Sequence, residues 1–344
     1  MRKNRLQLAM ILKRTALLAL GTIFLCSISV WAAPAPAFFA NPICEQADPW
    51  FLQYQGHYLA CFSETNHAIS VQMSDRLTAL GKKHIVWTTP PIGPTSDEAW
   101  APELHLLDGR WYIYFAADDG ENKNHRMFVL AGKTSDPLGE YSSPVELQTE
   151  GWAIDGTILA NHSGERFFVW SGWAGCSDGQ QNLYISRMAS PVELAGSRVL
   201  LTTPDQPWER QGMPICEGPQ ILTRGGKTFI VYSASASWTA DYCLAMLVHE
   251  GGDLTDATAW QKTAPIFTSN EHAWGVGHCG FLQTPEGENW LFYHAKTSRR
   301  AGWTDREVRA QPYSWTHDGM PKLNAPVPRH RPLWRTSADL EKAS

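Results

Sequence analysis

Hydrophobic and polar residues alternate along short segments of the chain that each follow a glycine. Gly109 precedes Arg-Trp-Tyr-Ile-Tyr-Phe, and Gly226 precedes Lys-Thr-Phe-Ile-Val-Tyr. Alternation with a period of two is typical of a β-strand with one buried face, and the glycine favours a tight turn before it. The same pattern begins at Gly56, Gly164 and Gly287, and no long amphipathic helix pattern is present. The sequence therefore predicts an all-β protein.

The spacing of the five glycines is regular, at 53, 55, 62 and 61 residues. A repeat of this length, built from short strands, is typical of a β-propeller with one blade per repeat. It predicts a five-bladed β-propeller that forms a single domain over residues 33–344. The blades are expected at about 47–74, 100–134, 153–187, 217–249 and 275–315, separated by loops rich in Pro, Gly and Thr.

An ionisable residue lies six to nine positions before each of these glycines. The first strand of a propeller blade lines the central channel, so these five side chains are expected to converge on one axis. Carboxyl groups held close together in a partly dry channel cannot all ionise at their free pKa, so one becomes an acid and another a base. Glycoside hydrolysis requires this division of roles. The five residues are Asp48, Glu103, Asp155, Glu217 and His278.

Each of these residues also has a structural interpretation when taken alone. Asp48 precedes Pro49 and could cap a turn, and Asp155 precedes a glycine and could do the same. Glu103 could be a hydrogen-bond acceptor in the channel, and His278 a buried core histidine. The shared register of all five positions favours the functional interpretation.

Further candidates for substrate contact come from aromatic and cationic residues. The chain has 16 tryptophans, and sugar faces stack well on aromatic rings. Trp50 and Trp100 flank channel residues and are the favoured sugar platforms, whereas Trp111 and Trp290 are expected in the core between blades. Arg309 is expected to donate to a sugar hydroxyl at the channel rim. The acidic run at residues 118–122 is interpreted as a solvated hairpin turn, since its spacing differs from that of a calcium-binding EF-hand loop.

The N-terminus resembles a secretory signal. Five basic residues precede an apolar run over residues 15–31, and Val30-Trp31-Ala32 fits a small-residue cleavage site. We expect residues 1–32 to be a signal peptide, with an uncleaved N-terminal anchor as the alternative. The protein would then be secreted or periplasmic, with no membrane contact after cleavage.

Charge and cysteine content narrow the class of partner. Removal of residues 1–32 leaves 24 basic residues against 34 acidic ones, which argues against nucleic acid as a partner and favours a neutral polysaccharide or oligosaccharide. Six of the seven cysteines follow residue 32. An even number in an exported chain permits disulfides but does not assign their pairing, and no zinc-binding spacing is present.

The ordered set of motifs resembles glycoside hydrolase family 43. The matching segments are Ala-Asp48-Pro, Trp-Ala-Pro-Glu103, Ile-Asp155-Gly-Thr, Glu217-Gly-Pro and Gly-His278, and the resemblance covers nearly the whole chain after the signal. His105, the strand that begins at Arg126, and the run Arg306-x-x-Arg309-x-Gln311 most resemble the branch of exo-acting α-L-arabinofuranosidases. The family acts on arabinose- and xylose-containing glycans.

The resemblance implies a role for each motif. Asp48 would be the general base, Glu217 the general acid, and Asp155 the residue that orients the acid and tunes its pKa. His278 would contact the substrate or help to hold a central, water-coordinated ion, often calcium, although no cofactor is required. The segment here reads Gly-Val-Gly-His-Cys279 rather than the Gly-Pro-Gly-His-Asn that is common in the family.

The resemblance predicts an inverting hydrolase that releases L-arabinofuranose from arabinan or arabino-oligosaccharides. A β-xylosidase is the first alternative, because both sugars are pentoses, and an endo-arabinanase of the same family is another. A non-catalytic glycan-binding propeller would be expected to lose one of the acid pair, and here the set is intact. A protein-interaction propeller of the WD40 type is disfavoured, since the repeat is too long and the Gly-His and Trp-Asp signature is missing.

Overall fold

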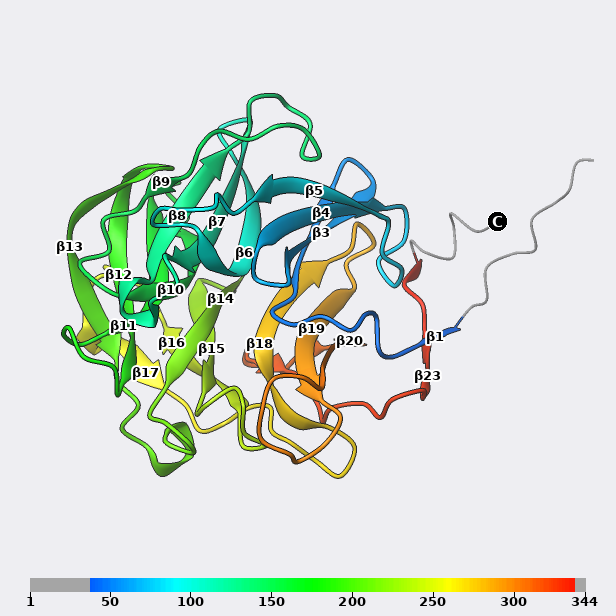
Figure 1. The fold of residues 1–344 in the computed structure, drawn as a ribbon. Coiled ribbons are helices and arrows are strands. Elements are labelled where there is room, and N and C mark those ends of the chain that lie inside the picture. Colours follow the sequence, from blue (N-terminus) through cyan, green and yellow to red (C-terminus); the bar gives the residue numbers. More distant parts are fainter. Residues whose placement is uncertain (1–37, 338–344) are drawn as a thin grey trace, which may run out of the picture. The chain divides into compact units, whose positions relative to one another are not determined.

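The computed structural model describes residues 38–337, and in them five antiparallel β-sheets are arranged as the blades of a propeller (Figure 1). The first strands of the blades contact one another in ring order, β2 with β6, β6 with β10, β10 with β14, β14 with β18, and β18 again with β2. This closed ring confirms the predicted all-β, five-bladed fold. The predicted signal peptide, residues 1–32, lies outside the described residues.

Four of the blades are four-stranded meanders, and the fifth has three strands. Blade one is β2 (Trp50–Tyr54), β3 (His57–Glu64), β4 (Ala68–Ser74) and β5 (Lys82–Thr88). Blade two is β6 (Asp97–Leu107), β7 (Arg110–Asp118), β8 (Arg126–Ala131) and β9 (Val145–Glu146). Blade three is β10 (Ala153–Ala160), β11 (Arg166–Trp173), β12 (Gln181–Ser190) and β13 (Glu193–Thr202). Blade four is β14 (Cys216–Arg224), β15 (Lys227–Ala234), β16 (Cys243–His249) and β17 (Trp260–Lys262), and blade five is β18 (Trp274–Gln283), β19 (Asn289–Lys296) and β20 (Arg306–Pro312).

The repeated glycines lie in the turns between the first and second strands of the blades. All five have φ between +77° and +88°, a left-handed conformation that only glycine adopts without steric cost. The space around each is open, so backbone conformation rather than crowding requires glycine there. The five are Gly56, Gly109, Gly164, Gly226 and Gly287.

The fourth strands were not recognised in the sequence, which placed the ends of blades one to four at residues 74, 134, 187 and 249. The structure extends these blades with β5, β9, β13 and β17. These outer strands are short or largely exposed; β13, for example, has only one buried residue among ten. An edge strand with two solvated faces has no strict alternation of polar and apolar residues, so its pattern is weak.

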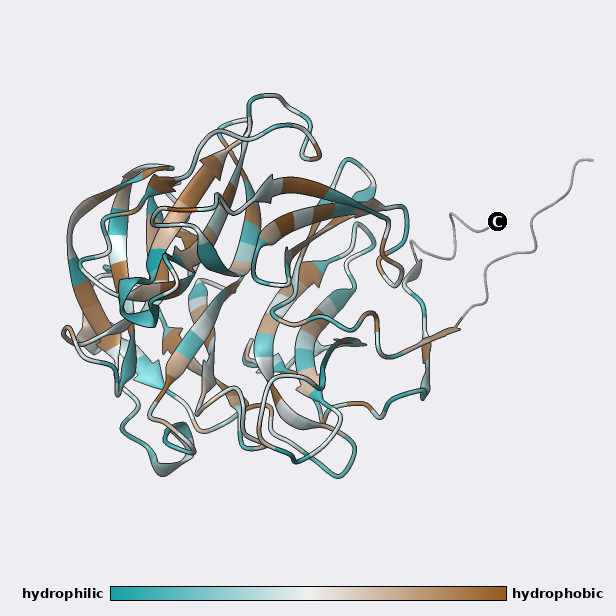
Figure 2. Cartoon of the chain, viewed as in Figure 1, coloured by the Kyte–Doolittle hydropathy of each residue, from teal (hydrophilic) through white to brown (hydrophobic). Residues whose placement is uncertain are grey.

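The hydrophobic core lies between neighbouring blades. One cluster joins Ile113 of blade two to Val71 of blade one, and another joins Tyr232 of blade four to Val169 of blade three. The hydropathy colouring shows the apolar residues concentrated on the strands, with more hydrophilic connecting loops (Figure 2). Trp111 is packed between blades one and two, and Trp290 between blades five and one, as the sequence predicted.

The N-terminal segment takes the place of a fourth strand on blade five. The backbone N–H of Val308 in β20 donates to the carbonyl of Cys44, and Ile43 N–H donates to the carbonyl of Val308. The buried Asn41 side chain donates to the carbonyl of Ala310 and accepts from its N–H, at 2.9 and 2.8 Å. β1 (Phe38–Ala40) then pairs with β23 (Pro332–Trp334), so segments near the two ends of the described chain meet.

The segment after blade five forms a small hairpin, β21 (Ser314–Trp315) with β22 (Pro321–Lys322), and then runs on in an extended conformation. Three 3-10 helices complete the described residues: η1 (Asn122–Asn124), η2 (Pro207–Glu209) and η3 (Ala257–Ala259). Within residues 38–337, no helix has the length and apolar character needed to cross a membrane.

Candidate active site

A cavity of about 650 Å³ lies where the first strands of the blades meet, and every blade contributes to its lining. Asp48 comes just before β2, Asp155 lies on β10, Glu217 on β14 and His278 on β18. Four of the five ionisable residues that were identified from their register therefore line one cavity. Trp100, which was predicted to be a sugar platform and lies on β6, lines the cavity as well.

Bulges in the first strands direct these side chains toward the cavity. The pairing register shifts in β10 between Ile154 and Thr157, in β14 after Glu217, and in β18 around His278. Asp48, Asp155 and His278 have φ of +52°, +55° and +42°, which is unfavourable for residues other than glycine. Strained backbone of this kind persists only where the surrounding fold enforces it, and a bulge re-aims the side chain of the residue it contains.

Glycines beside the bulges allow the blades to approach closely. A Cβ added to Gly277 would lie 2.3 Å from the Tyr242 ring, and one on Gly218 would lie 3.1 Å from the His278 ring. Gly218 also has φ of +56°. The Gly-rich motifs therefore serve both backbone conformation and packing at the axis.

The Asp48 carboxylate is surrounded by cationic and imidazole groups. Its Oδ1 lies 3.1 Å from His294 Nδ1, 3.3 Å from His278 Nδ1 and 3.4 Å from an Arg306 guanidinium nitrogen. Burial alone would raise the pKa of Asp48, but His278, Arg306 and His294 together hold it well below its usual value. Asp48 is therefore ionised across the neutral range and can accept a proton.

The Glu217 carboxyl has the opposite character. It is buried, and Tyr242 donates its hydroxyl proton to Oε1 at 2.8 Å. Burial raises the pKa of Glu217, the Tyr242 hydrogen bond partly offsets this, and the negative Asp48 raises it further. Glu217 therefore holds its proton to a higher pH than an ordinary glutamate does.

Asp155, on blade three, contacts the backbone of blade four beside Glu217. Its Oδ2 accepts from Gly218 N–H at 3.2 Å and lies 3.9 Å from His278 Nδ1. Burial raises the pKa of Asp155; His278 lowers it, while Glu217 and Asp48 raise it. Since Gly218 follows Glu217 directly, the Asp155 contact also fixes the backbone that carries Glu217.

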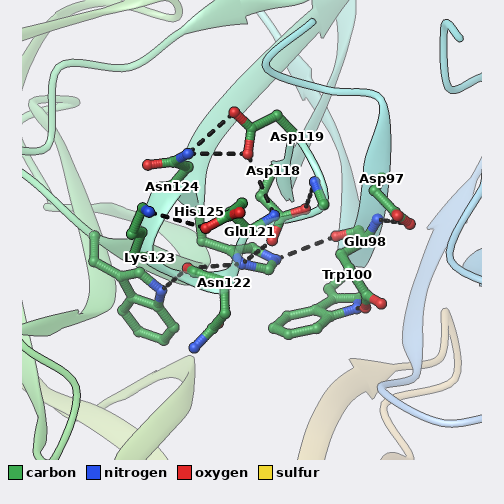
Figure 3. A network of polar contacts seen from close by, with 12 residues as sticks. Asp97, Glu98, Trp100, Asp118, Asp119, Glu121, Asn122, Lys123, Asn124 and His125 are labelled. Carbon is green, nitrogen blue, oxygen red and sulfur yellow. Dashed lines mark hydrogen bonds and ion pairs between the residues drawn. The ribbon is translucent and has the colours of Figure 1, made fainter. Parts of the chain in front are cut away.

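One wall of the cavity is built by blade two and the start of blade three (Figure 3). The Trp100 indole donates to Glu98 at 2.5 Å, and its rings stack on His125 with centroids 4.1 Å apart. His125 is fully buried and lies 2.9 Å from Asp118. Burial alone would raise the pKa of the Asp118 carboxylate, but His125 and the Gly120 N–H stabilise its charge and lower the pKa. Trp152 donates to the carbonyl of Asn122 at 2.7 Å and continues the wall.

This wall corrects the interpretation of residues 118–122 as a solvated turn. Asp118, Gly120 and Asn122 line the cavity, and the Asp118 side chain is buried. Asp119 does have the expected solvated position, with its carboxylate accepting from Asn124. The sequence could not distinguish the two neighbouring aspartates, because only the buried partner His125 makes one of them part of the wall.

Three residues that were predicted to contact the substrate lie outside the cavity lining: Trp50, Glu103 and Arg309. The Trp50 indole N–H donates to the carbonyl of Leu104 at 2.8 Å, and its ring packs on His105. Glu103 is buried between His105, at 2.9 Å, and the Gln220 side chain, which donates to it. Both residues therefore make structural contacts near the axis rather than contacts with the cavity.

Arg309 is also placed differently from the prediction. Its guanidinium is fully buried, pairs with Glu307 at 2.8 Å and donates to the carbonyls of His272 and Val327. Arg309 thus anchors the C-terminal segment to blade five. Alternation along β20 puts Arg309 and Arg306 on opposite faces, since they are three residues apart, and Arg306 is the arginine that lines the cavity.

Sequence reasoning missed three residues that contact the acids: Tyr242, His294 and Arg306. His294 directly follows the apolar run Trp-Leu-Phe-Tyr in β19 and is fully buried; burial lowers its pKa to about 4 although the Asp48 contact opposes this. A histidine within a buried strand is uncommon and was a usable signal. Tyr242 carried no comparable signal, because it precedes a strand. Arg306 was noticed in the run Arg306-x-x-Arg309-x-Gln311 but was not assigned to the site.

The described residues do not fit a directly bound calcium ion. Calcium takes six to eight oxygen ligands, whereas residues 38–337 contain no group of three or more His, Cys, Asp or Glu side chains arranged to hold a metal. His278, which was predicted to hold such an ion through water, has Nδ1 near Asp48 and Asp155. No catalytic step is therefore assigned to a metal.

Comparison with known proteins identifies the family. The sequence profile described as Glycosyl hydrolases family 43 matches residues 39–321. An extracellular exo-α-(1→5)-L-arabinofuranosidase from Streptomyces chartreusis is 34% identical over 279 residues, covering 77% of this chain and 84% of the relative. An enzyme of the same name from Streptomyces avermitilis is 31% identical over 92% of this chain and 69% of its own length.

The structural comparison agrees. The crystal structure of an α-L-arabinofuranosidase from Lactobacillus brevis superposes with a TM-score of 0.79 and 31% sequence identity, covering 85% of this chain and 98% of that one. The matches in sequence and in fold span the same propeller that holds the cavity and its acids. The chain therefore belongs to glycoside hydrolase family 43 and is a glycosidase.

Proposed function

We propose that this protein is a secreted, inverting, exo-acting α-L-arabinofuranosidase. The observation that supports this most directly is the pair of carboxyl groups in one cavity with opposite pKa shifts, lowered for Asp48 and raised for Glu217. Two acids with diverging pKa values are what acid–base glycoside hydrolysis needs. The relatives named exo-arabinofuranosidases support the choice of sugar and the exo action.

In this mechanism Glu217 protonates the glycosidic oxygen as the bond to the anomeric carbon breaks. Asp48, already ionised, removes a proton from a water molecule that attacks the anomeric carbon from the opposite face. The products are arabinose of inverted configuration and the shortened alcohol, and both carboxyl groups return to their starting protonation states through solvent. Inverting enzymes hold their two carboxyl groups about 6.5–9.5 Å apart to leave room for this water.

Asp155 orients the acid through its contact with Gly218 N–H, since Gly218 follows Glu217 directly. His278 and Arg306 stabilise the negative charge of Asp48 before the reaction. Trp100 on the wall of the cavity offers an aromatic surface to the sugar. Of the residues predicted to contact substrate, Trp100 and His278 are retained, and Trp50, Glu103 and Arg309 are not.

Export is proposed on two grounds. Residues 1–32 have the composition of a signal peptide, and two relatives are named extracellular. The substrate would be a neutral arabinose-containing polysaccharide or oligosaccharide, in keeping with the acidic charge balance of the chain.

The test is proton NMR of the hydrolysis of α-1,5-arabinobiose, with p-nitrophenyl α-L-arabinofuranoside and β-D-xyloside as comparison substrates. The first-formed arabinose should be the β-anomer; a first-formed α-anomer would contradict the role of Asp48 as base. Asp48→Ala should abolish turnover of both arabinosides. Glu217→Ala should lose less activity on the nitrophenyl arabinoside, whose leaving group needs little protonation. Faster hydrolysis of the xyloside would overturn the choice of sugar.

A further inference from the structure

Two tryptophans from different blades form an aromatic lip on the cavity. Trp238 lies in the connection between β15 and β16, and Trp303 in the connection between β19 and β20; both line the cavity. Their rings meet edge to face, with centroids 5.3 Å apart and planes at 75°. The Trp303 indole N–H donates to the hydroxyl of Ser237 at 3.0 Å. The two side chains therefore form one aromatic unit that bridges blades four and five.

Trp303 is exposed although it is held in place. The residue is 54% exposed, although it lines the cavity and its indole N–H is held by Ser237. The opposite wall differs, because Trp152 is buried between Trp173 and the region of His125. An indole face is thus open to solvent on the side of blades four and five.

A buried lysine fixes the two connections that carry the lip. Lys296, at the end of β19, is fully buried, and its ammonium donates to the carbonyls of Trp238, at 3.2 Å, and Gly302. Gly302 N–H also donates to the carbonyl of Trp238 at 2.9 Å. The ammonium lies 3.4 Å from Asp305. Burying an ammonium is costly unless such partners satisfy it, and here they tie the two connections together.

The lip is continuous with the acids. Three residues after Trp303 the chain reaches Arg306, which contacts Asp48. Glu217 begins the blade to which Trp238 belongs. The reacting sugar must lie among the buried acids, so the part of the substrate beyond the scissile bond extends toward solvent.

We infer that Trp303, supported by Trp238, is the platform for the sugar on the leaving-group side of the scissile bond. A sugar ring stacks on an aromatic face, and an exposed indole at the mouth supplies that face to the second residue of an arabino-oligosaccharide. Lys296 is a positioning residue for this platform and does not touch the substrate. The inference rests on the proposed function and adds the residues that recognise the leaving sugar.

The test compares two substrates that share the transferred sugar. α-1,5-Arabinobiose has a leaving sugar, whereas α-L-arabinofuranosyl fluoride has none. Trp303→Ala should lower kcat/KM for the disaccharide about tenfold and leave that for the fluoride unchanged. The matched control is Trp334→Ala, since Trp334 is also exposed, at 65%, but lies on β23 outside the cavity lining. It should change neither substrate.

The role of Lys296 is tested by a double-mutant cycle on the same ratio of disaccharide to fluoride. If Lys296 acts through the platform, Lys296→Met combined with Trp303→Ala should lower the ratio no further than Trp303→Ala alone. If the wild-type enzyme is active on both substrates and Trp303→Ala leaves the ratio of disaccharide to fluoride activity unchanged, the platform is contradicted but the proposed function is not. A wild-type enzyme inactive on both arabinosides contradicts the proposed function and the platform with it.

Discussion

Side chains of the same chemical type take opposite protonation states in this cavity because their neighbours differ. His278, His294 and Arg306 surround Asp48 and lower its pKa, whereas burial and the charge of Asp48 raise the pKa of Glu217. The three neighbours of Asp48 are supplied by blade five, whereas Glu217 is contacted by the Tyr242 hydroxyl from blade four. The assignment of base and acid therefore depends on which blade each carboxyl faces.

The two arginines of β20 give a prediction at this scale. Arg306 lowers the pKa of both Asp48 and Glu217, so Arg306→Ala should raise both. The base must be ionised and the acid protonated, so both limbs of the pH–rate profile should move to higher pH. The measurement is kcat/KM for α-1,5-arabinobiose across pH, because its leaving sugar requires protonation by Glu217.

Arg309→Ala is the matched variant. Arg309 is buried and pairs with Glu307, to which Arg329 also lies close at 3.0 Å. Its removal should destabilise the fold by about 3 kcal/mol, near the lower end for a broken buried pair, because Arg329 remains. Denaturant unfolding should show this loss, while the pH profile keeps its position. A shift of the profile by Arg309→Ala and none by Arg306→Ala would reverse the roles given to the two residues.

Three first strands, β10, β14 and β18, combine a bulge that directs a polar side chain inward with a glycine that lets a neighbouring side chain approach. In β18 the bulge contains His278, and Gly277 beside it faces the ring of Tyr242. Tyr242 in turn donates to Glu217. The geometry of the acid in blade four is thus set in part by the backbone of blade five.

Gly277→Ala tests this dependence between elements. The added Cβ would lie 2.3 Å from the Tyr242 ring, so the ring must move and its bond to Glu217 should weaken. We expect a loss of about 1–3 kcal/mol in unfolding free energy and a lower kcat for the arabinobiose reaction. The control is Gly175→Ala, where nothing lies within 4 Å of the added Cβ. Equal effects of the two substitutions would mean that the contact with Tyr242 is unimportant.

On the scale of the whole propeller, the ring depends on a few residues near its closure. Blade five has only three strands of its own, and residues 41–44 supply the fourth edge. The Asn41 side chain imitates a backbone partner by bonding both the N–H and the carbonyl of Ala310. Closure therefore joins residues that are 269 positions apart in the sequence.

Asn41→Ala should weaken this closure. It leaves the buried N–H and carbonyl of Ala310 without these partners, at a cost of about 1–3 kcal/mol for each group. The melting temperature should fall clearly, whereas the comparison variant Asn161→Ala, which alters an exposed turn, should have a smaller effect. Similar melting temperatures for the two variants would show that Asn41 does not stabilise the ring.

The number of blades and the register of four cavity residues could be predicted from the amino-acid sequence alone. Each blade needs a left-handed turn after its first strand, and only glycine meets that need cheaply, so a local backbone requirement repeats along the chain. Asp48, Asp155, Glu217 and His278 were found because each lies eight or nine positions before such a glycine. These features depend on local conformation, and local conformation is encoded by nearby residues.

The other side chains that reach the cavity could not be predicted in this way, because they are brought there by the packing of the blades. Arg306 rather than Arg309, His294 on a second strand, and the Trp238–Trp303 lip come from different blades, and their positions depend on how the blades pack. Glu103 kept the expected register but is enclosed by His105 and Gln220. The outer strands and the closure by Asn41 likewise depend on contacts between distant segments, which the alternation of residues along one strand does not record.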